Sequence, residues 1–211
     1  METSGILKLL NVRDSESKLV VDLSVHYFAQ SVGIAIFFTV CSSQFLNYYE
    51  IESLPYLFIG AGFAQLITAR IYTYFERSRN LNKMMPRVVG LLIILAFGAF
   101  VSGYVFEFSY HYIIGYLLFY VIYLLNSLEF WGVSAISFDV RQSKRLFGVI
   151  SMGDIPAKLL GYMVVPLFVA IFPINYLYLL AIIAFLASYL SLKKLLKHTK
   201  LHTEHDYRTV T

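Results

Sequence analysis

Six long apolar stretches follow one another along the chain and constrain its fold more than any other feature. A helix needs about 20 mostly apolar residues to cross the hydrocarbon core of a bilayer, and each stretch is long enough. Apolar residues are continuous within the stretches, which favours helices over the alternating strands of a membrane barrel. The sequence therefore predicts an all-α, polytopic membrane protein with transmembrane helices at residues 23–46, 53–75, 87–106, 112–138, 146–171 and 174–192.

The composition agrees with this class. Hydrophobic residues make up 58% of the chain and charged residues 14%, whereas soluble domains have roughly 45–50% apolar and 25% charged residues. The first stretch lacks the small-residue cleavage site of a secretory signal, so we expect the N-terminus to be retained. The single Cys41 excludes an intramolecular disulfide. We expect one membrane unit at residues 23–192, between an N-terminal segment at 1–22 and a polar tail at 193–211.

Basic residues predict the orientation of these helices. Lys and Arg precede the first span, occupy the second and fourth connections and follow the sixth span, whereas the other three connections have no Lys or Arg and contain Glu50, Glu52 and Glu107. By the positive-inside rule we expect both termini and the two basic connections to be cytoplasmic. This placement explains the net charge of +4 without a nucleic-acid partner. The orienting residues of the two connections are Arg77, Arg79, Lys83, Arg141, Lys144 and Arg145.

One cation, Lys158, lies far from both ends of its predicted span. It is roughly 20 Å along the helix from the preceding basic turn, near the middle of the bilayer. Asp154 precedes it by one helical turn, the favourable order for an ion pair, and Ser151 and Gly161 fall on the same stripe. A charge at the membrane centre costs at least about 2.5–3.5 kcal/mol, so we expect this stripe to face protein or water. Pro156 should kink the helix beside it.

Two other spans carry polar residues that could face this pair. Asp22, His26, Gln30 and Gly33 form a stripe at helical spacing in the first span, and Glu129 in the fourth span has a polar neighbour one turn earlier. Together they could enclose a polar cavity, or they could be buried pairs that specify helix packing. The candidate pathway residues are Lys158, Asp154, Glu129, His26, Gln30 and Asn126.

The fourth and fifth spans carry a family resemblance. The segments LEFWG at 128–132 and FDVRQSKRLFGVIS at 138–151 resemble the fourth-to-fifth helix region of bacterial ATP/ADP translocases, a family related to the major facilitator superfamily. Over the rest of the chain the resemblance is topological, to an N-terminal six-helix half. It implies alternating-access transport of a nucleotide across the inner membrane of a bacterium, a transport role for Glu129 and a gating role for the basic second connection.

The chain also departs from that family. A carrier of this type has about twelve helices, built from two six-helix halves, and the cytosolic modules often joined to bacterial relatives are absent from this sequence. Three alternatives follow: the chain is one portion of a longer protein, or two copies assemble, or the module has lost transport. In the last case we expect a membrane anchor or sensor that docks cytosolic regulatory partners through the basic turns.

No other chemistry is indicated by the sequence. There is no Gly-rich phosphate loop of the GxxxxGK type and no nucleophile, base and acid arranged for hydrolysis, so we expect neither an enzyme nor a cofactor. Three histidines recur at helical spacing in the polar tail and could in principle bind a transition metal. Terminal polar segments fray, so we expect no metal site at His198, His202 and His205.

Overall fold

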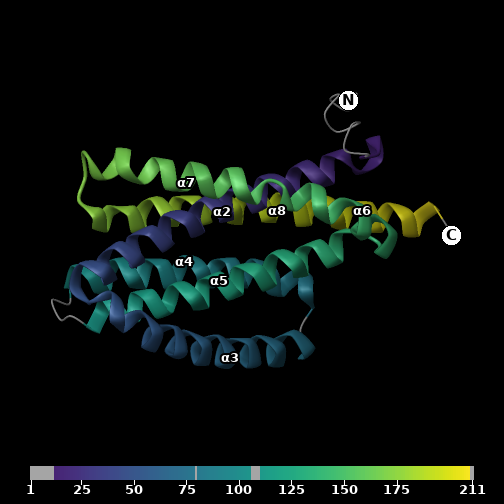
Figure 1. The fold of residues 1–211 in the computed structure, drawn as a ribbon. Helices are drawn as coiled ribbons and strands as arrows, with labels where there is room; N and C mark the ends of the chain where they lie inside the picture. The colour runs from purple at the N-terminus through teal and green to yellow at the C-terminus, as the bar shows by residue number, and fades with distance from the viewer. Residues whose placement is uncertain (1–11, 79, 106–109, 210–211) are drawn as a thin grey trace.

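The structure is a computed structural model that describes residues 12–78, 80–105 and 110–209 (Figure 1). Within these residues, six helical segments are long and apolar enough to cross a membrane, which confirms the all-α prediction of six spans. The first four spans are α2 (Asp14–Tyr48), α3 (Leu54–Ser78), α4 (Leu81–Val105) and α5 (Tyr110–Ser137). The fifth comprises α6 (Val140–Ser151) and α7 (Asp154–Val169), and the sixth is α8 (Leu177–Thr209). Short 3₁₀ turns at Ile51–Ser53 (η1) and Ile174–Tyr176 (η2) precede α3 and α8.

The first and last helices extend beyond their apolar stretches. α2 begins at Asp14 and not at residue 23, and α8 continues through the polar tail to Thr209. Hydropathy marks only the part of a helix that contacts hydrocarbon, so it cannot find polar turns at either end. At the start of α2, Glu16 accepts a hydrogen bond from the Arg13 backbone N–H at 3.3 Å, and this contact caps the first turn.

The fifth span is broken at Met152 and Gly153, one turn before the proline that predicted a kink. The Met152 N–H still bonds to the Gly148 carbonyl at 3.1 Å, and α7 resumes with a bond from Ala157 to the Gly153 carbonyl at 3.1 Å. Pro156 has no N–H to offer the Met152 carbonyl, and its ring would clash with that carbonyl in a continuous helix. The proline therefore sits in the first turn of a new helix, where it is tolerated.

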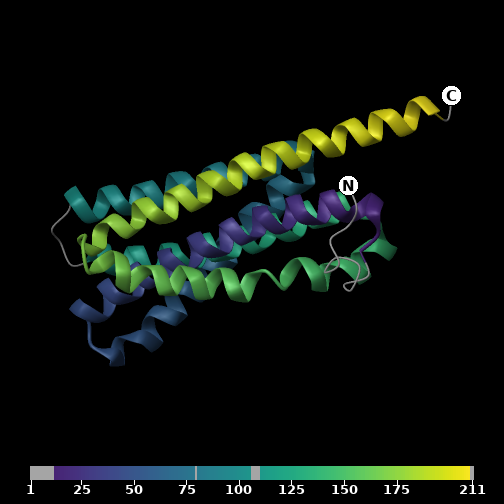
Figure 2. The ribbon, with the colours of Figure 1, turned by 90° about the horizontal axis from the view of Figure 1, so that it is seen from above.

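The six spans form two groups of three. In Figure 1, α2, α7 and α8 lie above α3, α4 and α5. α2 packs on α5, α7 and α8, while α5 packs on α2, α3 and α4, and α4 also contacts α8. Figure 2 shows from above that the start of α2 and the end of α8 lie at the same end of the bundle. That end also holds the α3–α4 and α5–α6 connections and is called the basic end below.

These contacts have an internal symmetry that is not visible in the sequence. If each of the first three spans is exchanged for the span three places later, the contact of α2 with α8 becomes that of α5 with α4. The contact of α2 with α7 likewise becomes that of α5 with α3, and the pairs α2·α5 and α4·α8 map onto themselves. α2 starts at the basic end and α5 at the opposite end (Figure 1). This contact pattern is the one expected of an inverted three-plus-three repeat.

Two glycines of the predicted polar stripes bring helices into close contact. A Cβ atom at Gly161 of α7 would lie 2.7 Å from the Ala35 Cβ atom of α2 and 3.1 Å from the Val32 carbonyl oxygen. A Cβ atom at Gly33 of α2 would lie 2.9 Å from the ring of Phe185 in α8. Small residues are common where membrane helices cross closely. These glycines therefore set the positions of α7 and α8 against α2.

The outer surface of the bundle is apolar. α3 and α7 are the least buried spans and occupy equivalent places in the two groups of three. Large side chains such as Phe63 and Leu66 on α3 and Leu159 and Leu167 on α7 are exposed. In a membrane such a surface contacts lipid or another protein, which fits the predicted bilayer partner.

Candidate functional site

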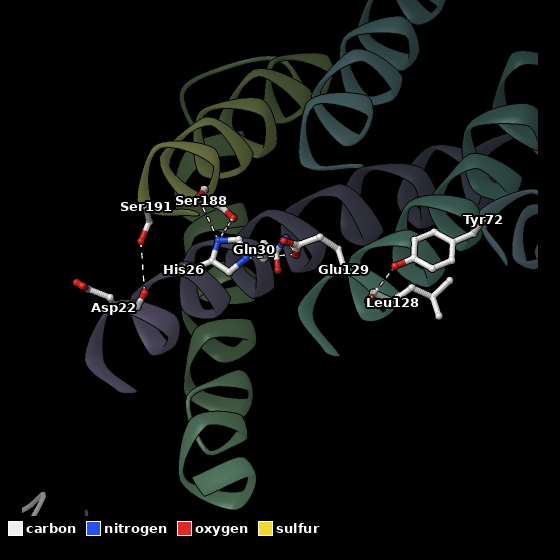
Figure 3. Close-up of polar contacts among 8 residues, drawn as sticks. All are labelled: Asp22, His26, Gln30, Tyr72, Leu128, Glu129, Ser188 and Ser191. Atoms are coloured by element: carbon white, nitrogen blue, oxygen red, sulfur yellow. Dashed lines mark hydrogen bonds and ion pairs between the residues drawn. The ribbon is translucent and has the colours of Figure 1, made fainter. Parts of the chain in front are cut away.

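Four side chains form a buried polar network where α2, α5 and α8 meet (Figure 3). His26 and Gln30 come from adjacent turns of α2, Glu129 comes from α5 and Ser188 from α8. Each is 0% exposed. Because His26 and Gln30 are four residues apart they share one helix face, and this face is turned toward Glu129.

The hydrogen bonds of this network converge on one carboxylate oxygen. The Gln30 Nε2 atom donates to Glu129 Oε2 at 2.7 Å, and His26 Nε2 lies 3.2 Å from the same oxygen. On the other side of the imidazole, Nδ1 lies 2.9 Å from the Ser188 hydroxyl and 3.0 Å from the Ser188 carbonyl oxygen. The network therefore connects three spans through polar contacts in an otherwise apolar interior.

Several buried oxygens near this network have no hydrogen-bond partner among the described residues. They include the Oε1 atoms of both Gln30 and Glu129, the Asn126 Oδ1 atom and the Ser134 hydroxyl. A buried polar group without a partner costs about 1–3 kcal/mol, and native structures contain few of them. Gln30 is on α2, and the other three residues are on α5, between Asn126 and Ser134.

The second polar cluster lies on the neighbouring face of α2, against α7. Lys158 Nζ and Asp154 Oδ2 form an ion pair at 2.7 Å, and the two side chains are 28% and 22% exposed. The Ser31 hydroxyl donates to Asp154 Oδ1 at 2.6 Å, and the Tyr27 hydroxyl also interacts with this carboxylate. The Lys158 amine lies 5.9 Å from the centroid of the Tyr123 ring on α5.

This cluster borders a small cleft of about 60 Å³. The cleft lies between α2, α5 and α7 and starts immediately after the break in the fifth span. Pockets for drug-sized ligands have about 300–1,000 Å³, so the cleft has room for a water molecule or one functional group. Its lining consists of Tyr27, Ser31, Ile34, Tyr123, Asn126, Ser127, Asp154 and Lys158.

The candidate pathway residues thus divide between two clusters. Lys158 and Asp154 pair with each other and face the cleft, and Asn126 lines the same cleft from α5. His26, Gln30 and Glu129 lie in the closed network on the neighbouring face of α2. Sequence reasoning had considered one cavity with all six residues around it.

Sequence reasoning also missed residues that complete both clusters. Tyr27 and Ser31 each follow a residue of the polar stripe by one position, so they point about 100° away from it and reach α7. Ser188 is a lone hydroxyl in an apolar span, a signal that could have been used. Tyr123 of α5 was not among the candidate residues, and it lines the same cleft.

A third polar contact lies at the basic end. Arg145 on α6 pairs with the nearly buried Glu16 on α2 at 2.5 Å, and Gln142 donates to the same carboxylate at 3.1 Å. About two turns into α2, the Asp22 carboxylate lies 3.7 Å from Lys194 Nζ, and the Asp22 carbonyl accepts a bond from Ser191 at 3.4 Å (Figure 3). The remaining described residues predicted to orient or gate are exposed: Arg77, Lys83, Arg141 and Lys144.

Two predictions concern residues that the structure does not describe. Arg79 lies outside the described residues, and so do the side chains of the three tail histidines. Within the described part of the chain, no group of His, Cys, Asp and Glu side chains is arranged to hold a metal ion.

Comparison of this chain with protein-family models, curated proteins and solved structures gives no significant match. The argument for function therefore depends on the chemistry and placement of the two clusters.

Proposed function

We propose that this chain is a component of a membrane transporter of major-facilitator type that carries an organic anion, most plausibly a nucleotide, by alternating access. The observation that carries the proposal is the Asp154–Lys158 ion pair. It lies within the fifth span and borders a polar cleft between α2, α5 and α7. Intramembrane ionisable residues are costly and usually mark substrate or ion pathways. The proposal requires no catalysed reaction and no cofactor.

The break in the fifth span gives the pair a second property of transport sites. Discontinuous helices expose backbone groups at their ends, and secondary transporters use such ends near the middle of the bilayer to bind substrates and ions. Asp154 is the first residue of α7 and directly follows the break at Met152 and Gly153. A substrate anion that attracts Lys158 away from Asp154 would change the contacts of α7 with α2.

The arrangement of spans also supports a facilitator-type half. Six-helix halves of these transporters are built from inverted three-plus-three repeats, and the contacts between spans follow that exchange rule. The two central helices of the pattern, α2 and α5, provide six of the cleft-lining residues, among them Tyr27 and Tyr123.

The size of the cleft indicates that one six-helix unit does not enclose the substrate alone. About 60 Å³ is too small for a nucleotide, whereas a second unit placed over the open side of α2, α5 and α7 would enlarge the enclosed volume. We therefore propose self-association, or assembly with a second six-helix half. The exposed apolar surfaces of α3 and α7, on either side of the central pair, are suited to that contact.

Nucleotide is preferred as the substrate only because residues 128–151 resemble ATP/ADP translocases. Glu129 is the acidic residue of that resemblance, and it joins α5 to α2 through Gln30 at 2.7 Å. A transport role for Glu129 would therefore act by changing helix contacts and not by touching the anion, because its side chain is 0% exposed.

A second candidate is a membrane anchor or sensor for cytosolic partners. It is favoured by α6, whose apolar Leu146 and Ile150 are fully buried while Arg141 and Lys144 are exposed on the other face. Such a helix at the basic end could bind an acidic partner protein.

The decisive experiment is uptake of labelled nucleotide and of smaller organic anions by proteoliposomes. We expect Lys158→Ala to lower uptake at least about tenfold, equivalent to about 1.4 kcal/mol, because the variant removes the cation of the cleft. Lys197→Ala, which removes an exposed cation near the end of the sixth span, should leave uptake unchanged. Both variants must keep the melting temperature within a few degrees for the comparison to hold.

Equal uptake by Lys158→Ala and the wild type would remove this site assignment. A protein that takes up no anion, but retains a cytosolic protein through Arg141 and Lys144, would establish the anchor candidate. The mass of the protein in mild detergent gives a separate test. A strictly monomeric protein would count against transport by this chain alone.

A further inference from the structure

The unpartnered oxygens of Gln30 and Glu129 lie in the same pair of side chains. A carboxylic acid beside a primary amide can form two antiparallel hydrogen bonds, one from the amide N–H to a carboxyl oxygen and one from the carboxyl O–H to the amide oxygen. The first bond is present, from Gln30 Nε2 to Glu129 Oε2 at 2.7 Å. The atoms of the second bond, the two Oε1 atoms, are buried without a partner among the described residues.

The surroundings of Glu129 disfavour a free negative charge. Its ion-pair partner is His26 of α2, and α8 contributes only the uncharged Ser188. From α3, the Tyr72 hydroxyl donates to the Leu128 carbonyl at 3.4 Å and interacts electrostatically with Glu129. An ionised carboxylate in a buried site needs a compensating positive charge. A single imidazole supplies that charge only when it is protonated.

The charged residues of the other neighbouring helices are engaged elsewhere. Arg145 of α6 pairs with Glu16, and Asp154 and Lys158 of α7 pair with each other. α4 contributes apolar residues, Met85 and Val89, to the same core layer.

We propose that His26 and Glu129 form a proton-binding site that holds one exchangeable proton, carried by Glu129 as a neutral acid. The Glu129 O–H then donates to the Gln30 carbonyl oxygen, and neutral His26 donates its Nε2–H to Glu129 Oε2. His26 Nδ1 accepts from the Ser188 hydroxyl. Every side-chain oxygen and nitrogen of the trio has a partner, and the network has no net charge. Release transfers this one proton to water and leaves a carboxylate.

The alternative distribution of the same proton is an imidazolium beside a carboxylate. That form lets the His26 Nδ1–H donate to the Ser188 carbonyl oxygen, 3.0 Å away, but it leaves both Oε1 atoms unpartnered and places two charges in a fully buried site. The two forms make opposite predictions for Glu129→Gln. A glutamine at this position retains an N–H group to donate to the Gln30 oxygen, so it reproduces the neutral acid. If His26 were instead an imidazolium, Glu129→Gln would remove its counter-ion.

The site also makes stability depend on pH. The folded chain holds one proton here, whereas above about pH 6.5 an unfolded chain holds none on ordinary His and Glu side chains. The folding equilibrium of the wild type should therefore weaken about tenfold per pH unit above that value until the site releases its proton. Glu129→Gln should lack this dependence. The proton site does not require transport. If the chain is a carrier, as proposed above, this proton is its coupling ion.

The test combines infrared spectroscopy and thermal unfolding of the purified full chain. We expect the wild type at neutral pH to show a protonated-carboxyl C=O band that shifts in D₂O, is lost in Glu129→Gln and is retained in the control Asp154→Asn. Nitrogen NMR of labelled histidine should show a neutral, Nε2-protonated ring for the signal that disappears in His26→Gln. Melting temperatures should fall with rising pH in the wild type and stay level in Glu129→Gln, while Glu129→Ala is less stable at every pH.

Three results would overturn the proposal: no Glu129-dependent carboxyl band at any pH, an imidazolium signal for His26 at neutral pH, or Glu129→Gln as unstable as Glu129→Ala. Uptake is measured separately. A carboxyl band in a protein that transports nothing would keep the proton site and reject the carrier. Uptake by a protein without the band would do the reverse.

Discussion

At the scale of single residues, Lys158 shows how a charge is retained in an apolar span. Its partner is one turn away on the same helix at 2.7 Å, so the pair forms as soon as the helix does. The Ser31 hydroxyl of α2 donates to the other carboxylate oxygen of Asp154 at 2.6 Å, and Tyr27 of α2 lines the same cleft. Local spacing therefore makes the ion pair, and a second helix completes its hydrogen bonding.

This arrangement predicts a measurable coupling between Asp154 and Lys158. Lys158→Met should lower the melting temperature because the carboxylate is left without its cation, and the double variant Asp154→Asn, Lys158→Met should recover much of the loss. The pair is partly exposed, so we expect a coupling of about 1–2 kcal/mol, between an exposed helical pair and a buried one. A double-mutant cycle in detergent, with Lys197→Met as the control, measures it. Additive effects would contradict the coupling.

At the scale of elements, α2 organises the bundle because two of its faces carry different chemistry. One face brings His26 and Gln30 to Glu129, and the next brings Tyr27 and Ser31 to Asp154. The close approach of α7 at Gly161 keeps the second set within hydrogen-bond distance. The two clusters therefore lie on neighbouring faces of α2, about 100° apart around the helix axis.

A matched pair of glycine variants tests this close approach. Gly161→Ala should lower stability by about 1–3 kcal/mol, because the new methyl group meets Ala35 and the backbone of Val32 and forces α7 outward. Gly148→Ala in α6 meets nothing within 4 Å, so it should stabilise its helix by about 0.5–1 kcal/mol. Melting temperatures of the two variants check both signs. A stabilising Gly161→Ala would show that α7 is not held closely against α2.

At the scale of the whole molecule, the distribution of charge predicts which end of the bundle faces the cytoplasm. The basic end carries both ends of the described chain and the exposed Lys83, while the opposite end carries Glu50 and Glu52. We expect the basic end to be cytoplasmic by the positive-inside rule.

Labelling of single cysteines tests this orientation. The native Cys41 is 1% exposed and should not react; in a Cys41→Ala background, Glu52→Cys should react with a membrane-impermeant maleimide on intact cells. Lys83→Cys should react only after the membrane is permeabilised, because its side chain lies at the other end of the bundle. The opposite pattern would invert the orientation and move the basic turns to the outside.

The sequence by itself determined the helical class, the six spans and the Asp154–Lys158 pair, because apolar length and spacing along one helix are local properties. It also indicated the break near Pro156, since a missing N–H acts within one turn. It could not separate His26, Gln30 and Glu129 from the cleft, because polar residues on two helices meet only when rotation and crossing are known. Gly33, Gly161 and their close contacts decided that rotation, so the division into a closed network and an open cleft is a property of the tertiary structure.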